Sequence, residues 1–424
     1  MPAPVRFARL GQWLEWQQSV HPSAIDLGLE RVARVLGRTG WGGFRQPVIT
    51  IGGTNGKGSC VALVDSILRA GGRRVGTFTS PHLVDYRERI RIDGEWLAEA
   101  SLVAAFERLA DALRDDSLTF FEFNTLAALL VFETAAPDAV VLEVGLGGRL
   151  DAVNVVDADV AVIVSVGLDH MEYLGPDVES IGREKAGIVR AGRPAVCGMR
   201  EPPRSVVEVA RSAGATLRVR GRDYDGTERE DGRWDYRDSR GELAGLPRPA
   251  LEGAAQIGNA ATAIAALREL SSRLPLSREA IERGLAGVQL AGRFQRVPAA
   301  GGFEWVLDVA HNPDAAAELA RNLADRPVAG RTLAVCAMLS DKDVPAVLTA
   351  VEGEVDRWFA ATTDGPRGLP DTGLAAHAAG VGITMTPGGS VHDAMRLAAR
   401  EARAGDRIVV FGSFHTVGPA LSCV

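Results

Sequence analysis

Residues 49–59 read ITIGGTNGKGS, a glycine-rich turn between a β-rich run and a helical pattern. Phosphate-binding loops end in Gly-Lys and continue directly with Ser or Thr, whose hydroxyl binds Mg²⁺. Here Gly58 follows Lys57, so the hydroxyl comes one position later, at Ser59. The order of strand, loop and helix still predicts a nucleotide phosphate site.

The chemistry of this loop favours phosphate binding over a plain connecting turn. Consecutive glycines leave backbone N–H groups that can face phosphate oxygens, and the N-terminus of a helix adds a partial positive charge. A turn that merely joins strand to helix would not need Lys57 at this position. Because Mg²⁺ prefers octahedral oxygen ligands from any part of a chain, the displaced hydroxyl implies that other ligands come from elsewhere.

Length and composition limit the class of protein. A chain of 424 residues, 46% hydrophobic and 24% charged, is expected to form two globular domains. The net charge of -7 is spread without a basic block, which argues against nucleic-acid or membrane partners. We expect a cytoplasmic protein, because no run has the length of a membrane span and the first residues lack a signal-peptide core. Neither a zinc site nor a disulfide framework is predicted from the scattered cysteines Cys60, Cys197, Cys336 and Cys423.

Alternating strand and helix patterns predict an α/β fold. Apolar runs between residues 47 and 170, separated by helical stretches, indicate a mainly parallel sheet flanked by helices. Residues 218–250 are rich in charge and glycine and predict exposed β-hairpins on the edge of that sheet, with helices at 259–270 and 277–286 to follow. A second, smaller, Rossmann-like α/β cycle comes next, so the predicted domains are 1–295, with the phosphate loop, and 296–424.

Polar residues follow three of the predicted strands. Ser80 follows VGTFT, Glu143 lies in VVLEVG and His170 ends GLDH. Ligands of open parallel sheets bind beyond the carboxyl ends of the strands, so these three side chains are predicted to share one cation. Glu143 resembles the acid that closes an apolar strand beside nucleotide phosphates. Taken alone, His170 is compatible with a structural role, and Lys185, on a predicted helix, with a solvated lysine.

A family resemblance is carried by ten motifs that occur in order: GTNGKGS, TSPHL, FEFNTL, LEVGLGGRLDAVN, LDHMEYLG, IGREKAGI, AGRFQ, DVAHNP, DKD and GSFHTV. By these motifs the chain resembles the folylpolyglutamate synthases, in the bifunctional bacterial form that is also dihydrofolate synthase. This family belongs to the ATP-dependent Mur ligase superfamily. The resemblance extends from residue 20 to residue 418, which is essentially the whole chain.

The resemblance implies a nucleotide site with metal ions. Ser80, Glu143 and His170 match the magnesium ligands of the family, and Lys185 matches a lysine that members carry as an Nζ-carbamate. The implied cofactors are ATP and two Mg²⁺ ions, with K⁺ as a further candidate. The loop residues implied to hold the ATP phosphates are Thr54, Asn55, Gly56, Lys57, Gly58 and Ser59.

Further residues are implied to meet the nucleotide and the amino acid. Asn259 and Arg293 match nucleotide-binding residues, and the arginine would reach the γ-phosphate from the domain junction. Asp308 and His311 match residues that meet the nucleotide and the incoming amino acid, so domain closure would complete the site and exclude water. His311 is the candidate general base.

The resemblance also implies a pterin pocket, in which an acid and an aromatic wall suit a flat ring with amine and amide donors. Without the resemblance, residues 25–36 read as the start of an amphipathic helix. Two positions depart from the family: Val153 replaces a common Thr, and Phe120 stands where a relative often has Tyr. The implied pocket residues are Ile25, Asp26, Leu27, Gly28, Thr119, Phe120 and Asp151.

The implied activity is ATP-dependent ligation of L-glutamate to dihydropteroate and to reduced folylpolyglutamates, through an acyl phosphate and by a monomer. A monofunctional folylpolyglutamate synthase is one alternative. A ligase for a cell-wall nucleotide precursor would need an N-terminal uridine-nucleotide domain, whereas the phosphate loop begins by residue 52. A nucleotide switch without ligase chemistry would have no use for DVAHN and EKAGI.

Overall fold

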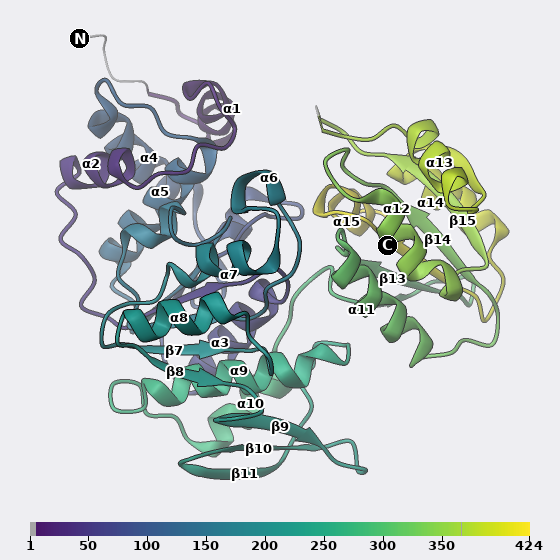
Figure 1. The fold of residues 1–424 in the computed structure, drawn as a ribbon. Helices are drawn as coiled ribbons and strands as arrows, with labels where there is room; N and C mark the ends of the chain where they lie inside the picture. The colour runs from purple at the N-terminus through teal and green to yellow at the C-terminus, as the bar shows by residue number, and fades with distance from the viewer. Residues whose placement is uncertain (1–5, 366) are drawn as a thin grey trace. The chain divides into compact units, whose positions relative to one another are not determined.

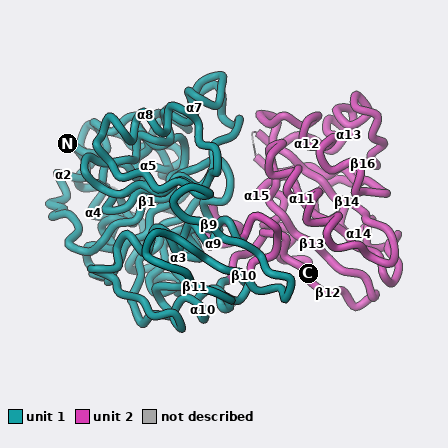
Figure 2. The backbone as a smooth tube through the Cα atoms, turned by 60° about the horizontal axis from the view of Figure 1, so that its bottom comes forward, with its two compact units in different colours: residues 1–80, 87–250, 257–288 teal, residues 81–86, 251–256, 289–424 magenta. Residues whose placement is uncertain are grey.

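The computed structural model describes residues 6–365 and 367–424. Contacts divide the chain into two compact units, which Figure 2 draws in different colours. Unit 1 contains residues up to 80, residues 87–250 and residues 257–288, and unit 2 contains residues 81–86, 251–256 and 289–424. The last and longest segment of unit 2 therefore begins at residue 289, a few residues before the predicted boundary at 295. Two short earlier segments, 81–86 and 251–256, also belong to unit 2.

Unit 1 is built on an eight-stranded sheet with the strand order β4-β3-β2-β5-β1-β6-β7-β8. Figure 1 labels β7 and β8 of this sheet. The strands from β2 to β8 in this order are parallel, and β3 and β4 add an antiparallel edge. This confirms the predicted α/β fold with a mainly parallel sheet. The strands are β1(Val48–Gly52), β2(Val75–Phe78), β3(Ile90–Ile92), β4(Glu95–Trp96), β5(Ala139–Glu143), β6(Val160–Ile163), β7(Pro194–Cys197) and β8(Thr216–Val219).

The strands and helices of unit 1 follow from their sequences. Every residue of β1 and β5 is buried, as expected for parallel strands covered by helices. Helix α3 packs against β1, β2 and β5, and α5 packs against β2 and β3. Helices α1, α2, α4 and α5 contact one another in the N-terminal part of the unit. The helices are α1(Leu10–Val20), α2(Glu30–Arg38), α3(Lys57–Ala70), α4(Glu99–Leu113), α5(Phe120–Ala135), α6(Met171–Leu174), α7(Val178–Ala186), α8(Arg204–Ser212), α9(Ala255–Glu269) and α10(Arg278–Gly287), with short 3-10 turns η1(Tyr86–Arg89) and η2(Ala152–Val155).

Within the predicted segment 218–250, residues 224–246 form a sheet of their own rather than hairpins on the edge of the large sheet. The predicted hairpins are present as β9(Tyr224–Glu228), β10(Trp234–Asp238) and β11(Gly241–Leu246), paired antiparallel. Their predicted exposure is wrong for Trp234 and Tyr236, both 0% exposed. These large rings require a covered face, which a hairpin in solvent would not provide.

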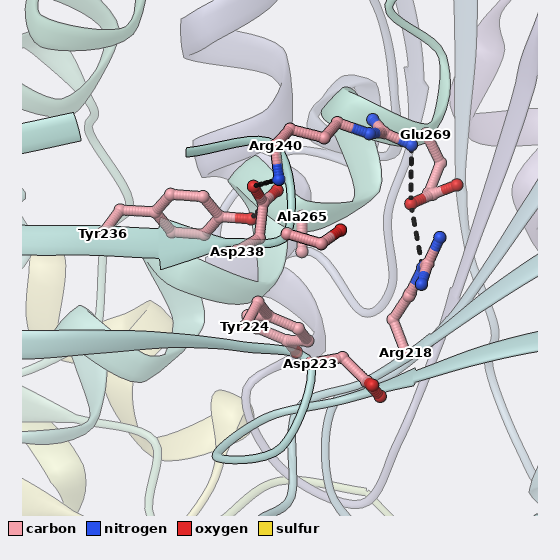
Figure 3. A pocket seen from close by; sticks show the side chains of 9 residues that line it. Arg218, Asp223, Tyr224, Tyr236, Asp238, Arg240, Ala265 and Glu269 are labelled. Atoms are coloured by element: carbon pink, nitrogen blue, oxygen red, sulfur yellow. Dashed lines mark hydrogen bonds and ion pairs between the residues drawn. The ribbon is translucent and has the colours of Figure 1, made fainter. Parts of the chain in front are cut away.

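Figure 3 shows a polar hollow lined by this small sheet, β8 and α9. Its interior volume of about 10 Å³ suits a single water molecule. Arg218 and Arg240 both reach the Glu269 carboxylate, at 3.2 and 3.0 Å. The hollow is therefore too small for a substrate, and these charged groups neutralise one another.

Unit 2 is an α/β unit with a six-stranded sheet in the order β12-β13-β17-β14-β15-β16. Only β12 runs antiparallel to its neighbour, and apolar side chains form a core cluster on each side of the sheet. The strands are β12(Gln295–Pro298), β13(Glu304–Asp308), β14(Thr332–Cys336), β15(Arg357–Thr362), β16(Met385–Ser390) and β17(Arg407–Phe411). The helices are α11(Pro313–Ala324), α12(Val344–Val351), α13(Asp371–Gly380), α14(Val391–Glu401) and α15(Phe414–Leu421), with a 3-10 turn η3(Glu352–Glu354).

Two further expectations concern the whole chain. All four cysteines are free thiols, and Cys60, Cys197 and Cys336 are buried. Among the described residues, no helix combines the length and apolar character that a membrane crossing requires.

Candidate active site

The glycine-rich loop adopts a conformation that only glycines permit at two positions. Gly53 has φ +153° and Gly56 has φ +81°, and the loop joins β1 directly to α3. Ser165, just after β6, holds the loop: its carbonyl accepts the Thr54 N–H at 2.9 Å and its hydroxyl accepts the Asn55 N–H at 2.9 Å. The first turn of α3 presents N–H groups that no helix carbonyl can accept, which is the basis of anion binding at such loops.

Two side chains complete this loop. Lys57 folds back so that its ammonium donates to the carbonyls of Gly53 at 3.0 Å and Thr54 at 3.1 Å. Asn259, at the start of α9, lies against Gly56, where a Cβ atom would be 3.1 Å from the Asn259 Oδ1 atom. The structure therefore brings Asn259 to the loop although 200 residues of sequence separate them.

Replacement of Gly56 by alanine is expected to lower the free energy of unfolding of the protein by about 1–3 kcal/mol more than the same change at Gly72. An alanine at either site has positive φ, but the Gly56 methyl would also lie 2.9 Å from Val164 Cγ1, whereas Gly72 has open space. Urea unfolding of both variants tests this. Equal losses would show that the loop relaxes around the added methyl group.

The predicted metal ligands lie at the carboxyl edge of the large sheet. The Ser80 N–H donates to Glu143 Oε2 at 3.0 Å, which brings together two of the three predicted ligands. Glu143, the last residue of β5, is buried, and carboxylate and hydroxyl oxygens are ligands that Mg²⁺ prefers. The residues therefore fit a divalent cation. Within the described ranges no group of three or more His, Cys, Asp or Glu side chains is placed to hold a metal ion by itself.

The sequence pattern placed His170 at the end of a strand, and this prediction is wrong. Strand β6 ends at Ile163, and His170 lies further along, with φ +51°, directly before α6. Its Nε2 atom is 3.8 Å from Asp169 Oδ1. Positive φ is uncommon outside glycine and is often found at functional positions, so the strained backbone is compatible with a ligand role.

Lys185 is not a solvated lysine, so that alternative is wrong. The side chain lies on α7, the residue is 4% exposed, and its ammonium donates to the Gly53 carbonyl at 3.0 Å. This is the same carbonyl that Lys57 contacts. Burial, and then the charge of Lys57, lower the pKa of Lys185 to about 7. Two ammonium groups on one carbonyl oppose each other, so the neutral form of Lys185 is favoured.

The two predicted pterin segments both belong to unit 1. Residues 25–28 are not helical, and α2 begins only at Glu30, so the interpretation of 25–36 as a helix start is wrong for its first residues. Thr119 is the N-cap of α5 and forms a capping box with Glu122. Phe120, the first residue of α5, has the Arg89 guanidinium 5.4 Å from its ring centroid.

Asp151 has a structural role that the sequence did not indicate. Its buried carboxylate accepts the Leu146 N–H at 2.8 Å and the Val153 N–H at 3.0 Å, and thereby fixes the loop after β5. Burial raises the pKa of Asp151 to about 7, although backbone N–H groups and Lys57 act in the opposite direction. A carboxyl group of this kind can change its protonation state near neutral pH.

The remaining predicted residues lie in unit 2. The Arg293 guanidinium is 5.1 Å from the centroid of the Phe414 ring. Asp308 accepts the N–H groups of Phe294 and Ala310, both at 2.8 Å, and burial raises its pKa while Arg293 lowers it. The His311 Nδ1 atom is 2.8 Å from the Val309 carbonyl. Since a carbonyl can only accept, this contact places the proton on Nδ1 and leaves Nε2 as the basic ring nitrogen.

Several residues around this site were missed by the reading of the sequence. Ser165 holds the phosphate loop, Phe414 faces Arg293, and Arg31 contacts both Asp26 and Glu122. Phe414 lies inside the motif GSFHTV and Arg31 lies within residues 25–36, so the sequence contained a signal for both. Ser165 lies in no quoted motif.

The composition of the chain draws attention to Lys57 and Lys185. Of the 47 Lys and Arg residues, only three are lysines: Lys57, Lys185 and Lys342. A guanidinium stays protonated at all accessible pH values, whereas an amine can lose its proton and act as a nucleophile. Two of the three lysines, Lys57 and Lys185, contact the Gly53 carbonyl of the phosphate loop.

Comparisons with known proteins now define the class. One family model, described as the Mur ligase middle domain, matches residues 51–217, and another, described as Mur ligase, glutamate ligase domain, matches residues 292–414. A dihydrofolate synthase/folylpolyglutamate synthase from Escherichia coli (strain K12) is 44% identical over 421 residues, which cover 99% of this chain and 97% of the relative. The chain therefore belongs to the dihydrofolate synthase/folylpolyglutamate synthase family of Mur ligases.

Solved structures agree with this assignment. E. coli FolC in complex with DHPP and ADP has a TM-score of 0.92 at 44% identity, covering 98% of this chain and 97% of that one. A bifunctional folylpolyglutamate synthase/dihydrofolate synthase with Mn, AMPPNP and L-glutamate bound has a TM-score of 0.90 at 42% identity, covering 99% of each chain. The described fold is therefore that of known enzymes of this family.

Proposed function

We propose that this protein uses ATP to join L-glutamate to dihydropteroate, which gives dihydrofolate, and to reduced folylpolyglutamates. The similarity over nearly the full length to a relative that bears both names carries this proposal. Solved relatives hold ADP together with DHPP, or AMPPNP together with Mn and L-glutamate, which are ligands of such a reaction. The ammonium groups of Lys57 and of the buried Lys185 both lie at the Gly53 carbonyl of the loop that we assign to the ATP phosphates.

The reaction needs an activated acid, because a carboxylate and an amine do not condense in water at neutral pH. The pterin substrate's carboxylate attacks the γ-phosphorus of ATP, the bond to the bridging oxygen breaks, and ADP leaves. The resulting acyl phosphate is attacked at carbon by the α-amine of L-glutamate. The carbon–oxygen bond to phosphate then breaks, and the amide and inorganic phosphate are released.

The chain's own cations stabilise the first step. Lys57 is held at the phosphate loop, and Arg293 is the residue proposed as a second cation. Both would neutralise charge on the transferring phosphoryl group, as cations do in other phosphoryl transfers. The Nε2 atom of His311 is our candidate to accept the proton that the glutamate ammonium must lose.

Ser80, Glu143 and His170 are the residues proposed to hold Mg²⁺, which would supply further neutralisation of the phosphate charges when bound. We propose that Lys185 reacts with CO₂ to give a carbamate and a proton. At present two ammonium groups at the Gly53 carbonyl repel each other. With a carbamate on Lys185, the negative group would attract the Lys57 ammonium instead. It would also add two oxygen ligands at this edge of the sheet.

The pterin ring is assigned to the segment 25–28, to Thr119 and Phe120, and to the loop that Asp151 holds. Arg31 and His21 both pair with the Oδ2 oxygen of Asp26. Oδ1 is therefore the oxygen that we assign to an N–H of the ring. We further propose a cytoplasmic monomer, with residues 1–295 for ATP and pterin and residues 296–424 for glutamate ligation.

An oxygen label tests this proposal. Dihydropteroate with ¹⁸O in its carboxyl group is incubated with ATP and L-glutamate, and the released inorganic phosphate is analysed by mass spectrometry. One labelled oxygen per phosphate is expected, because the carboxylate oxygen leaves with phosphorus. Unlabelled phosphate would contradict the acyl phosphate.

The choice of acceptor separates the proposed bifunctional enzyme from its alternatives. ADP release with dihydropteroate and with a reduced folate supports two activities, whereas release with the folate alone indicates a monofunctional folylpolyglutamate synthase. A slow rate of ADP release that does not change when the acceptor or L-glutamate is added would indicate a nucleotide-binding module without ligase chemistry.

A further inference from the structure

A single guanidinium connects the two segments of the proposed pterin pocket. Arg31, in the first turn of α2, donates from Nη2 to the Asp26 carbonyl at 2.5 Å and pairs through Nη1 with the Asp26 carboxylate. The same side chain donates from Nη2 to Glu122 Oε1 at 2.7 Å and from Nε to Glu122 Oε2 at 3.2 Å. Asp26 belongs to the first pocket segment, and Glu122 lies beside the second.

Glu122 transmits this contact to the pocket residues of α5. Its Oε2 atom accepts the Thr119 N–H at 2.8 Å, and the Thr119 hydroxyl accepts the Glu122 N–H at 3.2 Å. The oxygen that binds Arg31 therefore also fixes the start of α5, where Phe120 follows. Figure 1 shows α2 and α5 in the same N-terminal group of helices, and the two helices are in contact.

The surroundings make this link rigid. The side chain of Glu122 is 4% exposed and that of Arg31 is 18% exposed, so the pair is shielded from water. A planar guanidinium that reaches both oxygens of one carboxylate fixes distance and angle together, which a lysine cannot do. Arg31 thus donates both to Asp26, within residues 25–28, and to the Glu122 carboxylate.

We infer that Arg31 is a positioning residue for the pterin substrate: it holds the Asp26 segment and the Thr119–Phe120 helix start in one arrangement before the ring binds. This inference rests on the proposed function. It predicts that Arg31, which contacts both pocket segments, acts on the affinity for the pterin acceptor and not on the affinity for ATP. Preorganisation of this kind lowers the ordering cost of binding.

The test measures steady-state kinetics and equilibrium binding of dihydropteroate in the presence of ADP. Replacement of Arg31 by Met should raise the KM for dihydropteroate about tenfold to a hundredfold, the effect expected when a binding group moves by about 1 Å. The KM for ATP should not change. Arg34→Met is the matched control, because Arg34 lies on the same helix and pairs with Asp116 at 2.8 Å, outside the pocket.

A second variant separates positioning from folding. Arg31→Met leaves Glu122 buried without its cation, which alone can destabilise the protein. The double variant Arg31→Met with Glu122→Gln removes both charges, so its melting temperature should recover while the KM for dihydropteroate stays high. A KM that recovers together with the melting temperature would overturn the inference, as would a wild-type KM in Arg31→Met.

The proposed function and this inference fail in different ways. If the unaltered protein makes no ADP with dihydropteroate and L-glutamate, the proposed function fails. If it does, and dihydropteroate binds to the Arg31 variants as tightly as to the Arg34→Met control, only the role of Arg31 fails. Arg31→Lys should resemble Arg31→Met, because an ammonium cannot span Asp26 and both oxygens of Glu122.

Discussion

Replacement of Lys57 by alanine should lower the rate of ADP formation about a hundredfold to a thousandfold with either acceptor. The Lys57 ammonium is held at the phosphate loop by the carbonyls of Gly53 and Thr54, so its charge is in place before ATP binds. Loss of one such preorganised contact to a developing negative charge costs on the order of a hundredfold to a thousandfold in rate. A coupled assay of ADP, with dihydropteroate and L-glutamate at saturation, measures this loss.

Two controls make the Lys57 result specific. Dihydropteroate binding should weaken far less than the rate falls in Lys57→Ala, since Thr119 and Phe120 lie on α5 and Lys57 acts on the pterin pocket only through the charge of Asp151. Lys57→Arg should recover only part of the rate, because a guanidinium is broader than the ammonium that fits between the two carbonyls. Full turnover of Lys57→Ala would remove the loop lysine from the reaction.

Replacement of Lys185 by alanine is expected to lower kcat about a hundredfold, the size of loss typical for a group that organises charge in an active site. Millimolar formate or acetate should restore part of the activity, because the proposed role of the carbamate is to present oxygen ligands. Lys185→Arg is the control: it retains a cation but forms no carbamate, and it leaves no cavity for the added acid. Unchanged activity of Lys185→Ala would return Lys185 to a purely structural role.

The pH dependence of this modification has a definite sign. Carbamate formation consumes the neutral amine and releases a proton. With a pKa lowered to about 7, the neutral fraction of Lys185 grows as the pH rises through neutrality, whereas an ordinary lysine stays charged until about pH 10. At a fixed partial pressure of CO₂, labelling of Lys185 by ¹³CO₂ should therefore increase from pH 6 to pH 8 in the NMR spectrum. No carbamate signal over this range would contradict the proposal.

The parts of the site that share a local pattern could be predicted from the sequence. Glycines and a lysine between a strand and a helix predicted the phosphate loop, since the backbone geometry of such a turn depends on adjacent residues. Glu143 could be placed at a sheet edge because an apolar run ends there. The lysine on a helix was foreseen, but the burial of Lys185 was not, because it depends on Gly53, which is 132 residues away.

The contacts that order the pockets could not be derived from local patterns. Arg31 and Glu122 are 91 residues apart, and on its own helix each reads as an ordinary charged residue. The separate sheet of residues 224–246 was misplaced for a related reason: hairpin propensity is local, whereas the burial of Trp234 depends on what packs against it. Motif resemblance located the functional residues, and only the folded chain shows which of them act on one another.

The interleaving of the two units in the sequence has a practical consequence for dissecting the enzyme. The chain passes between them five times, after residues 80, 86, 250, 256 and 288. The segment 251–256 is tied to α11 of unit 2, where Asn322 Oδ1 accepts the Ala254 N–H at 3.1 Å. A gene fragment that starts at residue 289 would lack this segment and residues 81–86, so chimeras between family members must exchange three stretches of DNA together to transplant an intact glutamate-ligase half.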